Sequence, residues 1–156
     1  MSFFDNGLQF SCTQCSHCCR IEPGYVFLSR SDLTKLSLWF NFSEEHFIRT
    51  YCRKVPYYDG TDVLCLRETQ SYDCILWNNG CTAYGARPVQ CSTYPFWSRL
   101  MSTESFWNEE KKSCPGIGNG KLWSKSEIME QLASYEHNEP LHFHACSTTT
   151  MKGDSN

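Results

Sequence analysis

The stretch SCTQCSHCCRIEPGYVFLSRSDL, residues 11–33, decides the fold that we expect for this chain. Its first nine residues hold four cysteines, Cys12, Cys15, Cys18 and Cys19. A metal–thiolate site needs sulfurs on a short loop, because one ion must contact several of them at about 2.3 Å for zinc. A two-residue spacer lets the backbone curl so that two sulfurs point at one centre, and here the spacer occurs twice in succession. The stretch therefore predicts a metal-binding loop.

The cysteine content of the whole chain favours reduced thiols over a disulfide scaffold. Eleven cysteines would leave one unpaired, and the adjacent pair Cys18 and Cys19 can bond to each other only through a strained ring. The N-terminal sequence MSFFDNGLQF lacks the basic start and apolar run of a signal peptide. Since no apolar stretch of about 18 residues occurs either, we expect no membrane span. We therefore expect a cytoplasmic protein, in which thiols stay reduced.

Length and composition point to one compact domain. The chain has 156 residues, of which 40% are hydrophobic and 15% aromatic, so extensive disorder is not expected. The net charge is −3, and lysines and arginines are scattered along the chain. This pattern gives no electrostatic footprint for a phosphate backbone, so nucleic-acid binding is not expected. The sequence also lacks a P-loop, a dinucleotide fingerprint, a nucleophile elbow and an HExxH motif.

Capping residues predict several short helices. Ser29 or Ser31 can cap a helix over residues 32–40, and Ser43 marks the start of a second helix. Ser124 opens a capping box, in which its hydroxyl and a glutamate three residues later satisfy each other's backbone N–H groups. An apolar face follows it, as expected for a helix that packs on a core.

Alternation between apolar and polar residues predicts strands in the middle of the chain. Residues 62–68 (DVLCLRE) and 71–77 (SYDCILW) both have this period of two. The turn NNG at 78–80 tolerates positive φ, so it predicts a hairpin that returns as a strand at 81–84. The segment KSCPGIGNGK at 112–121 is predicted to be a turn-rich loop.

Together these signals predict a small single α+β domain with short helices and a β-hairpin, organised around a cysteine-ligated metal site. We expect an N-terminal segment at 1–11, the metal-binding domain at 12–137 and a flexible tail at 138–156.

Three motifs resemble a known family. They are the octet CxxCxxCC at 12–19, the segment CILWNNGCTAYGARPVQCSTYPFW at 74–97, and CPGIGNGK at 114–121. In this order they are similar to the YkgJ-type cysteine-cluster family, a CxxCxxCC zinc- or iron-chelating domain. The resemblance implies a metal ion as partner and eight thiolate ligands. These ligands are Cys12, Cys15, Cys18, Cys19, Cys74, Cys81, Cys91 and Cys114.

Eight thiolates leave the identity and the number of centres open. Two zinc ions with four thiolates each satisfy the set, and so does an iron–sulfur cluster on four thiolates with the others on a second metal or free. The protein partner and the oligomeric state are not indicated by the sequence.

Three function classes follow. The first is a metal-binding module for zinc or iron. The second is an iron- or iron–sulfur-dependent enzyme of redox chemistry or protein modification, with Arg87 and Tyr94 lining the site. Flagellin lysine-N-methylases share the cysteine octet in a longer chain. The third is a thiol redox switch or a metal-delivery protein that uses the vicinal pair Cys18 and Cys19.

The remaining metal-ligand residue types receive simpler interpretations. His17 is expected to be a solvated loop side chain, and Cys52 and Cys65 fall on apolar faces that suit core packing. His142, His144 and Cys146 lie on one side of an extended segment, in the predicted tail.

Overall fold

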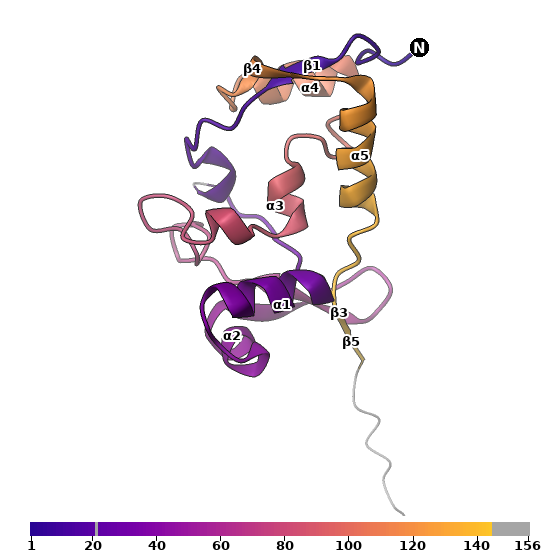
Figure 1. The fold of residues 1–156 in the computed structure, drawn as a ribbon. Helices are drawn as coiled ribbons and strands as arrows, with labels where there is room; N and C mark the ends of the chain where they lie inside the picture. The colour runs from indigo at the N-terminus through magenta and orange to yellow at the C-terminus, as the bar shows by residue number, and fades with distance from the viewer. Residues whose placement is uncertain (21, 145–156) are drawn as a thin grey trace, which may run out of the picture.

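The structure, a computed structural model, describes residues 1–20 and 22–144. Two small sheets lie at opposite ends of the molecule, and the cysteine-bearing loops lie between them (Figure 1). Helices accompany each sheet, so the predicted α+β class is confirmed. No helix in this described part of the chain combines the length and the apolar character needed to cross a membrane.

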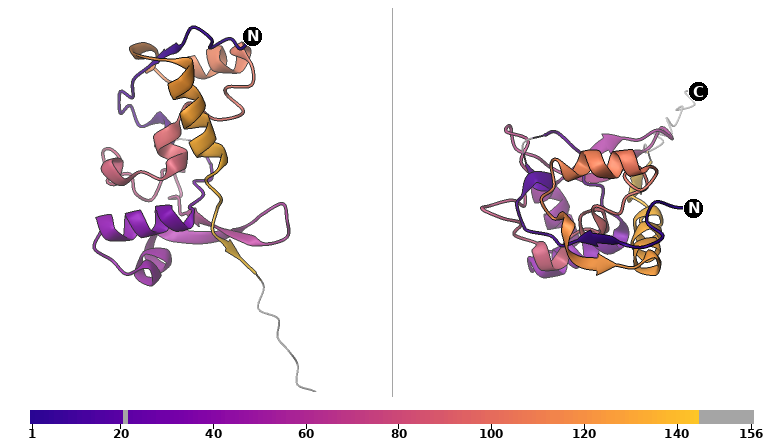
Figure 2. Two further views of the ribbon diagram at one scale, coloured as in Figure 1. Left: turned by 45° about the vertical axis from the view of Figure 1, so that its right-hand side comes forward. Right: turned by 90° about the horizontal axis from the view of Figure 1, so that it is seen from above.

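One end of the molecule is a three-stranded sheet with two helices. The strands are β2 (Cys52–Pro56), β3 (Asp62–Leu66) and β5 (His142–Phe143), in the order β2-β3-β5 and antiparallel throughout. Helices α1 (Arg30–Trp39) and α2 (Glu44–Tyr51) pack beside them (Figure 2). The β2–β3 pair provides a β-hairpin, although at a different place from the one predicted.

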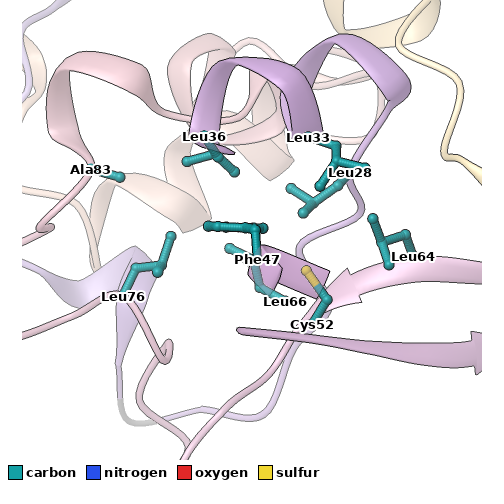
Figure 3. Packing of buried hydrophobic residues seen from close by; sticks show 9 residues of the cluster. All are labelled: Leu28, Leu33, Leu36, Phe47, Cys52, Leu64, Leu66, Leu76 and Ala83. Atoms are coloured by element: carbon teal, nitrogen blue, oxygen red, sulfur yellow. The ribbon is translucent and has the colours of Figure 1, made fainter. Parts of the chain in front are cut away.

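This end has its own hydrophobic cluster, here called the α1–α2 core. Phe47 of α2 and the leucines of α1 point toward one another and toward β3 (Figure 3). Leu33, Leu36 and Phe47 are completely buried, as the helical spacing requires. The members of the α1–α2 core are Leu28, Leu33, Leu36, Phe47, Cys52, Leu64, Leu66, Leu76 and Ala83.

At the other end of the molecule, β1 (Leu8–Phe10) and β4 (Ile117–Trp123) form a two-stranded antiparallel sheet (Figure 1). Helices α4 (Glu104–Lys111) and α5 (Lys125–Glu136) lie at the same end. Its aromatic-rich cluster is here called the α4–α5 core. The members are Phe4, Phe10, Phe96, Met101, Trp107, Cys114, Ile117 and Ile128.

Short elements connect the two ends. The 3-10 helix η1 (His17–Cys19) carries the end of the cysteine octet, and η2 (Tyr84–Ala86) and α3 (Val89–Thr93) lie within the second cysteine motif. In Figures 1 and 2 these segments lie between the two sheets, and α3 lies beside α5.

The predicted helix starts are confirmed at three serines. Ser29 caps α1, Ser43 caps α2 and Ser124 caps α5, each by accepting a backbone N–H of the first turn. Ser29 and Ser124 both form complete capping boxes. These starts are readable from sequence because the interaction is local.

The predicted strand at 71–77 is wrong. Its backbone groups bond to two different segments, since Cys74 donates to Cys19 and Ile75 donates to Arg67. Beyond the turn, Asn79 and Gly80 do adopt positive φ, but the two arms share only the single bridge between Trp77 and Cys81. Because no continuous partner strand exists for it among the described residues, the segment stays irregular.

Two further predictions need correction. The predicted loop at 112–121 contains most of β4, whose partner β1 lies in the N-terminal segment that we set apart from the domain. The predicted tail at 138–156 contains β5 (His142–Phe143), which pairs with β3. Cys146, with residues 145–156, lies outside the described residues.

Replacing Ser124 by alanine should lower the free energy of unfolding by about 1 kcal/mol, because the N–H of Glu127 loses its capping acceptor. Urea denaturation followed by circular dichroism measures the change. Ser126→Ala alters an exposed serine two residues into the same helix and is the matched control, with an expected change within about 0.5 kcal/mol. Equal losses in the two variants would contradict a capping role.

Candidate metal centre

A cavity of about 80 Å³ lies between the two hydrophobic cores. Leu66 and Leu76 of the α1–α2 core form part of its wall, and Phe10 and Cys114 of the α4–α5 core form another part. All eight cysteines that the family resemblance implies as ligands line this one cavity. They are Cys12, Cys15, Cys18, Cys19, Cys74, Cys81, Cys91 and Cys114.

The cysteines reach the cavity from segments far apart in the sequence. Cys18 and Cys19 lie on η1, Cys91 on α3, and Cys114 between α4 and β4. The N–H of Cys74 donates to the carbonyl of Cys19 over 2.7 Å, which joins the octet directly to the second motif. The octet is therefore held against residues more than fifty positions away.

Within the octet the backbone follows a tight curl. Gln14 and Ser16 both have positive φ, at 55° and 69°. The N–H of Gln14 donates to the sulfur of Cys12 over 3.4 Å. A backbone N–H aimed at sulfur is the kind of contact that stabilises a thiolate.

The sulfur spacing fits a metal in part. The Sγ atoms of Cys18 and Cys19 lie 3.8 Å apart. Tetrahedral zinc at about 2.3 Å from each sulfur requires neighbouring sulfurs to be about 3.8 Å apart. However, within residues 1–20 and 22–144 no three cysteine, histidine or acidic side chains are grouped closely enough to hold an ion together. The donor chemistry fits zinc or iron, and rotation about χ1 is the motion that moves a cysteine sulfur without moving the backbone.

The surroundings oppose ionisation of five of the eight thiols. Burial raises the pKa of Cys74 to about 11, and it also raises the pKa values of Cys81, Cys91 and Cys114. The contact with the Cys19 thiol raises the pKa of Cys18. Repulsion among the thiolates adds to the effect, so a bound cation is what would allow several of them to ionise together.

Arg87 supplies a nearby positive charge. Its guanidinium lies 4.0 Å from the centre of the Tyr84 ring, and its Nε donates to the Tyr84 carbonyl over 3.0 Å. Its charge partly offsets the rise in the pKa values of Cys18, Cys81 and Cys91. Arg87 is therefore placed to neutralise a negative thiolate centre.

Tyr94 lies next to Cys114. Its hydroxyl donates to Oε1 of Glu110 over 2.6 Å. Burial, followed by this contact, raises the pKa of Tyr94, so it remains a neutral donor. Both Arg87 and Tyr94 line the cavity.

The other ligand-type residues are placed differently. His17 lines the cavity, whereas Cys52 and Cys65 are buried away from it. His142 lies on β5, where its Nδ1 is 2.7 Å from Oγ1 of Thr61, and His144 is exposed at the end of the described chain. The ten described cysteines form no disulfide with one another.

The α+β fold and the thiol-lined cavity define a small cysteine-cluster domain. Residues 11–115, which are most of the chain, match the CxxCxxCC family model, described as a "putative zinc- or iron-chelating domain". The chain belongs to this family. No solved structure matches it.

The raised thiol pKa values predict that zinc affinity increases with pH. Each thiol that becomes a ligand releases a proton, so acid favours the metal-free form, and affinity should rise by up to about tenfold per pH unit for each proton released. Because the pKa of Cys74 is about 11, the rise should continue past pH 9, where an ordinary thiol would level off. Competition titrations against a zinc-binding dye between about pH 6 and pH 10 measure this slope. A pH-independent affinity would contradict thiolate ligation.

Proposed function

We propose that this protein is a metal-binding module whose cavity thiolates hold zinc or iron and join the two halves of the fold. One observation carries the proposal: the eight cysteines of the family motifs line a single cavity, and Cys52 and Cys65 do not. Thiolates are the donors that select zinc and iron–sulfur centres.

The proposal gives the metal a structural role. Each core contains only a handful of fully buried side chains, and the wall between the cores consists largely of cysteine-bearing loops. Small domains with limited cores often depend on metal ligation for stability. Where the unfolded chain has no preformed site, the free energy of metal binding becomes free energy of folding.

Eight thiolates are enough for two ions with four ligands each. The sulfurs of Cys18 and Cys19 lie 3.8 Å apart, which is the spacing of two ligands on one tetrahedral ion. We propose that these two thiolates share a centre.

Cys15→Ser should remove at least one metal ion and lower the melting temperature, because a serine hydroxyl is a poor substitute for a thiolate ligand. Elemental analysis of anaerobically purified protein measures the metal, and colour separates the two candidates, since an iron–sulfur protein is brown and a zinc protein is colourless.

Cys52→Ala is the matched control, because Cys52 is a buried cysteine of the α1–α2 core that lies away from the cavity. It should lose some stability from the shortened side chain and keep the full metal content. A Cys15→Ser protein with normal metal content and normal melting would refute the proposal.

A larger neighbouring cavity favours the enzyme as a second candidate function. This cavity of about 490 Å³ shares Cys18, Cys19, Cys74, Cys91 and Tyr94 with the first. Its volume lies in the range of about 300–1,000 Å³ that is typical of small-molecule sites. A substrate bound there would lie against the thiols and beside Tyr94, whose hydroxyl donates to Glu110 and can still accept a hydrogen bond.

The two functions differ in whether the metal keeps a position open to small molecules. Azide added to the Co²⁺-loaded protein should leave the visible absorption spectrum unchanged if protein sulfurs fill every coordination position of the metal. A shift of the absorption bands on adding azide would favour the enzyme.

A further inference from the structure

One face of α1 holds the backbone of the segment at 82–89, which lies between Cys81 and Cys91. Asp32, Lys35 and Trp39 follow one another at spacings of three and four residues, so they lie on the same face of the helix. We propose that these three are positioning residues, which fix the segment so that Cys81 and Cys91 face the metal. This inference rests on the proposed metal-binding function.

Each of the three side chains bonds to a backbone group of the segment. Nε1 of Trp39 donates to the carbonyl of Thr82 over 3.0 Å, and Nζ of Lys35 donates to the carbonyl of Arg87 over 2.7 Å. The N–H of Val89 donates to Oδ1 of Asp32 over 3.0 Å. The bonds lie at the beginning and toward the end of the segment, so both of its ends are fixed.

The middle of the segment rests on the indole ring of Trp39. A Cβ atom added to Gly85 would lie 2.8 Å from Cη2 of Trp39, closer than real contacts allow. Only glycine lets the backbone approach the ring this closely, and a larger residue would push the indole away from Thr82.

The base of this arrangement is rigid. Asp32 is 1% exposed, and its carboxylate also completes the capping box at Ser29 and accepts from Nδ2 of Asn138. Leu33 and Leu36, on the neighbouring face of α1, are fully buried in the α1–α2 core. The helix therefore cannot shift without disturbing the core.

The segment needs this external support because its own bonds are few. The N–H of Ala86 donates to the carbonyl of Ala83 over 2.9 Å, and the N–H of Thr82 donates outward to the carbonyl of Leu76 over 2.9 Å. A loop that must be ordered when its ligands bind costs conformational entropy, which weakens the affinity. A loop already held by α1 avoids most of that cost.

The test removes single contacts and leaves the cysteines intact. Trp39→Phe keeps an aromatic ring but loses the Nε1 donor, and Lys35→Met keeps a long unbranched side chain but loses the Nζ donor. Gly85→Ala adds a methyl group that displaces the indole of Trp39. Leu38→Ala, at a 76% exposed position of the same helix, is the matched control. Lys35→Arg, which keeps a donor, should restore much of the effect of Lys35→Met.

Zinc affinity is measured by competition with a chelator, and the reactivity of each cysteine in the Zn²⁺-loaded protein is measured by alkylation and mass spectrometry. Each of the three variants should weaken zinc binding about tenfold, equivalent to about 1.4 kcal/mol. Alkylation should accelerate about tenfold at Cys81 and Cys91 and stay unchanged at Cys15 and Cys114. Leu38→Ala should behave like the unaltered protein.

The inference would be overturned if the unaltered protein binds zinc and the variants protect Cys81 and Cys91 from alkylation as well as the unaltered protein does. Equal acceleration at all cysteines, including the core residue Cys52, would also overturn it, because that outcome reports general destabilisation. If the unaltered protein bound neither zinc nor iron, the proposed function would fail first and this inference with it.

Discussion

The cavity between the α1–α2 core and the α4–α5 core is the constraint on which the rest of the structure depends. Its wall takes Leu66 and Leu76 from one core and Phe10 and Cys114 from the other, and the remaining lining is mostly thiol-bearing loop. Burial and the charges of Cys74, Cys18 and Cys81 all oppose ionisation of the Cys91 thiol, so a bound cation would be needed for these four thiols to ionise together. Protonated thiols would therefore hold the two cores together weakly, and thiolates that shared a metal ion would hold them together strongly.

Local signals in the sequence predicted the features that depend on near neighbours. The caps at Ser29, Ser43 and Ser124 were predictable because a hydroxyl and an N–H three residues apart decide them. The curl of the octet was predictable from its two-residue spacers, and the structure places positive φ at Gln14 and Ser16.

Features that depend on distant partners were not predictable in the same way. The glycine-rich stretch before Trp123 has the composition of a loop, and it becomes β4 only because β1, more than a hundred residues away, pairs with it. Conversely, residues 71–77 have the alternation of a strand, but Cys19 and Arg67 take their backbone bonds. Nothing in the sequence links Lys35 or Trp39 to the segment at 82–89, since the hydrogen bonds of both go to its backbone carbonyls, which any residue supplies.

The separation of the cysteines along the chain has a consequence during protein synthesis. Cys19 emerges from the ribosome 95 residues before Cys114, since 114 minus 19 is 95. At about 5–20 residues per second, the nascent octet waits roughly 5–20 s before the whole set of thiols exists. During that interval oxidants and competing ions can reach the sulfurs of the octet before Cys74, Cys81, Cys91 and Cys114 have all been made.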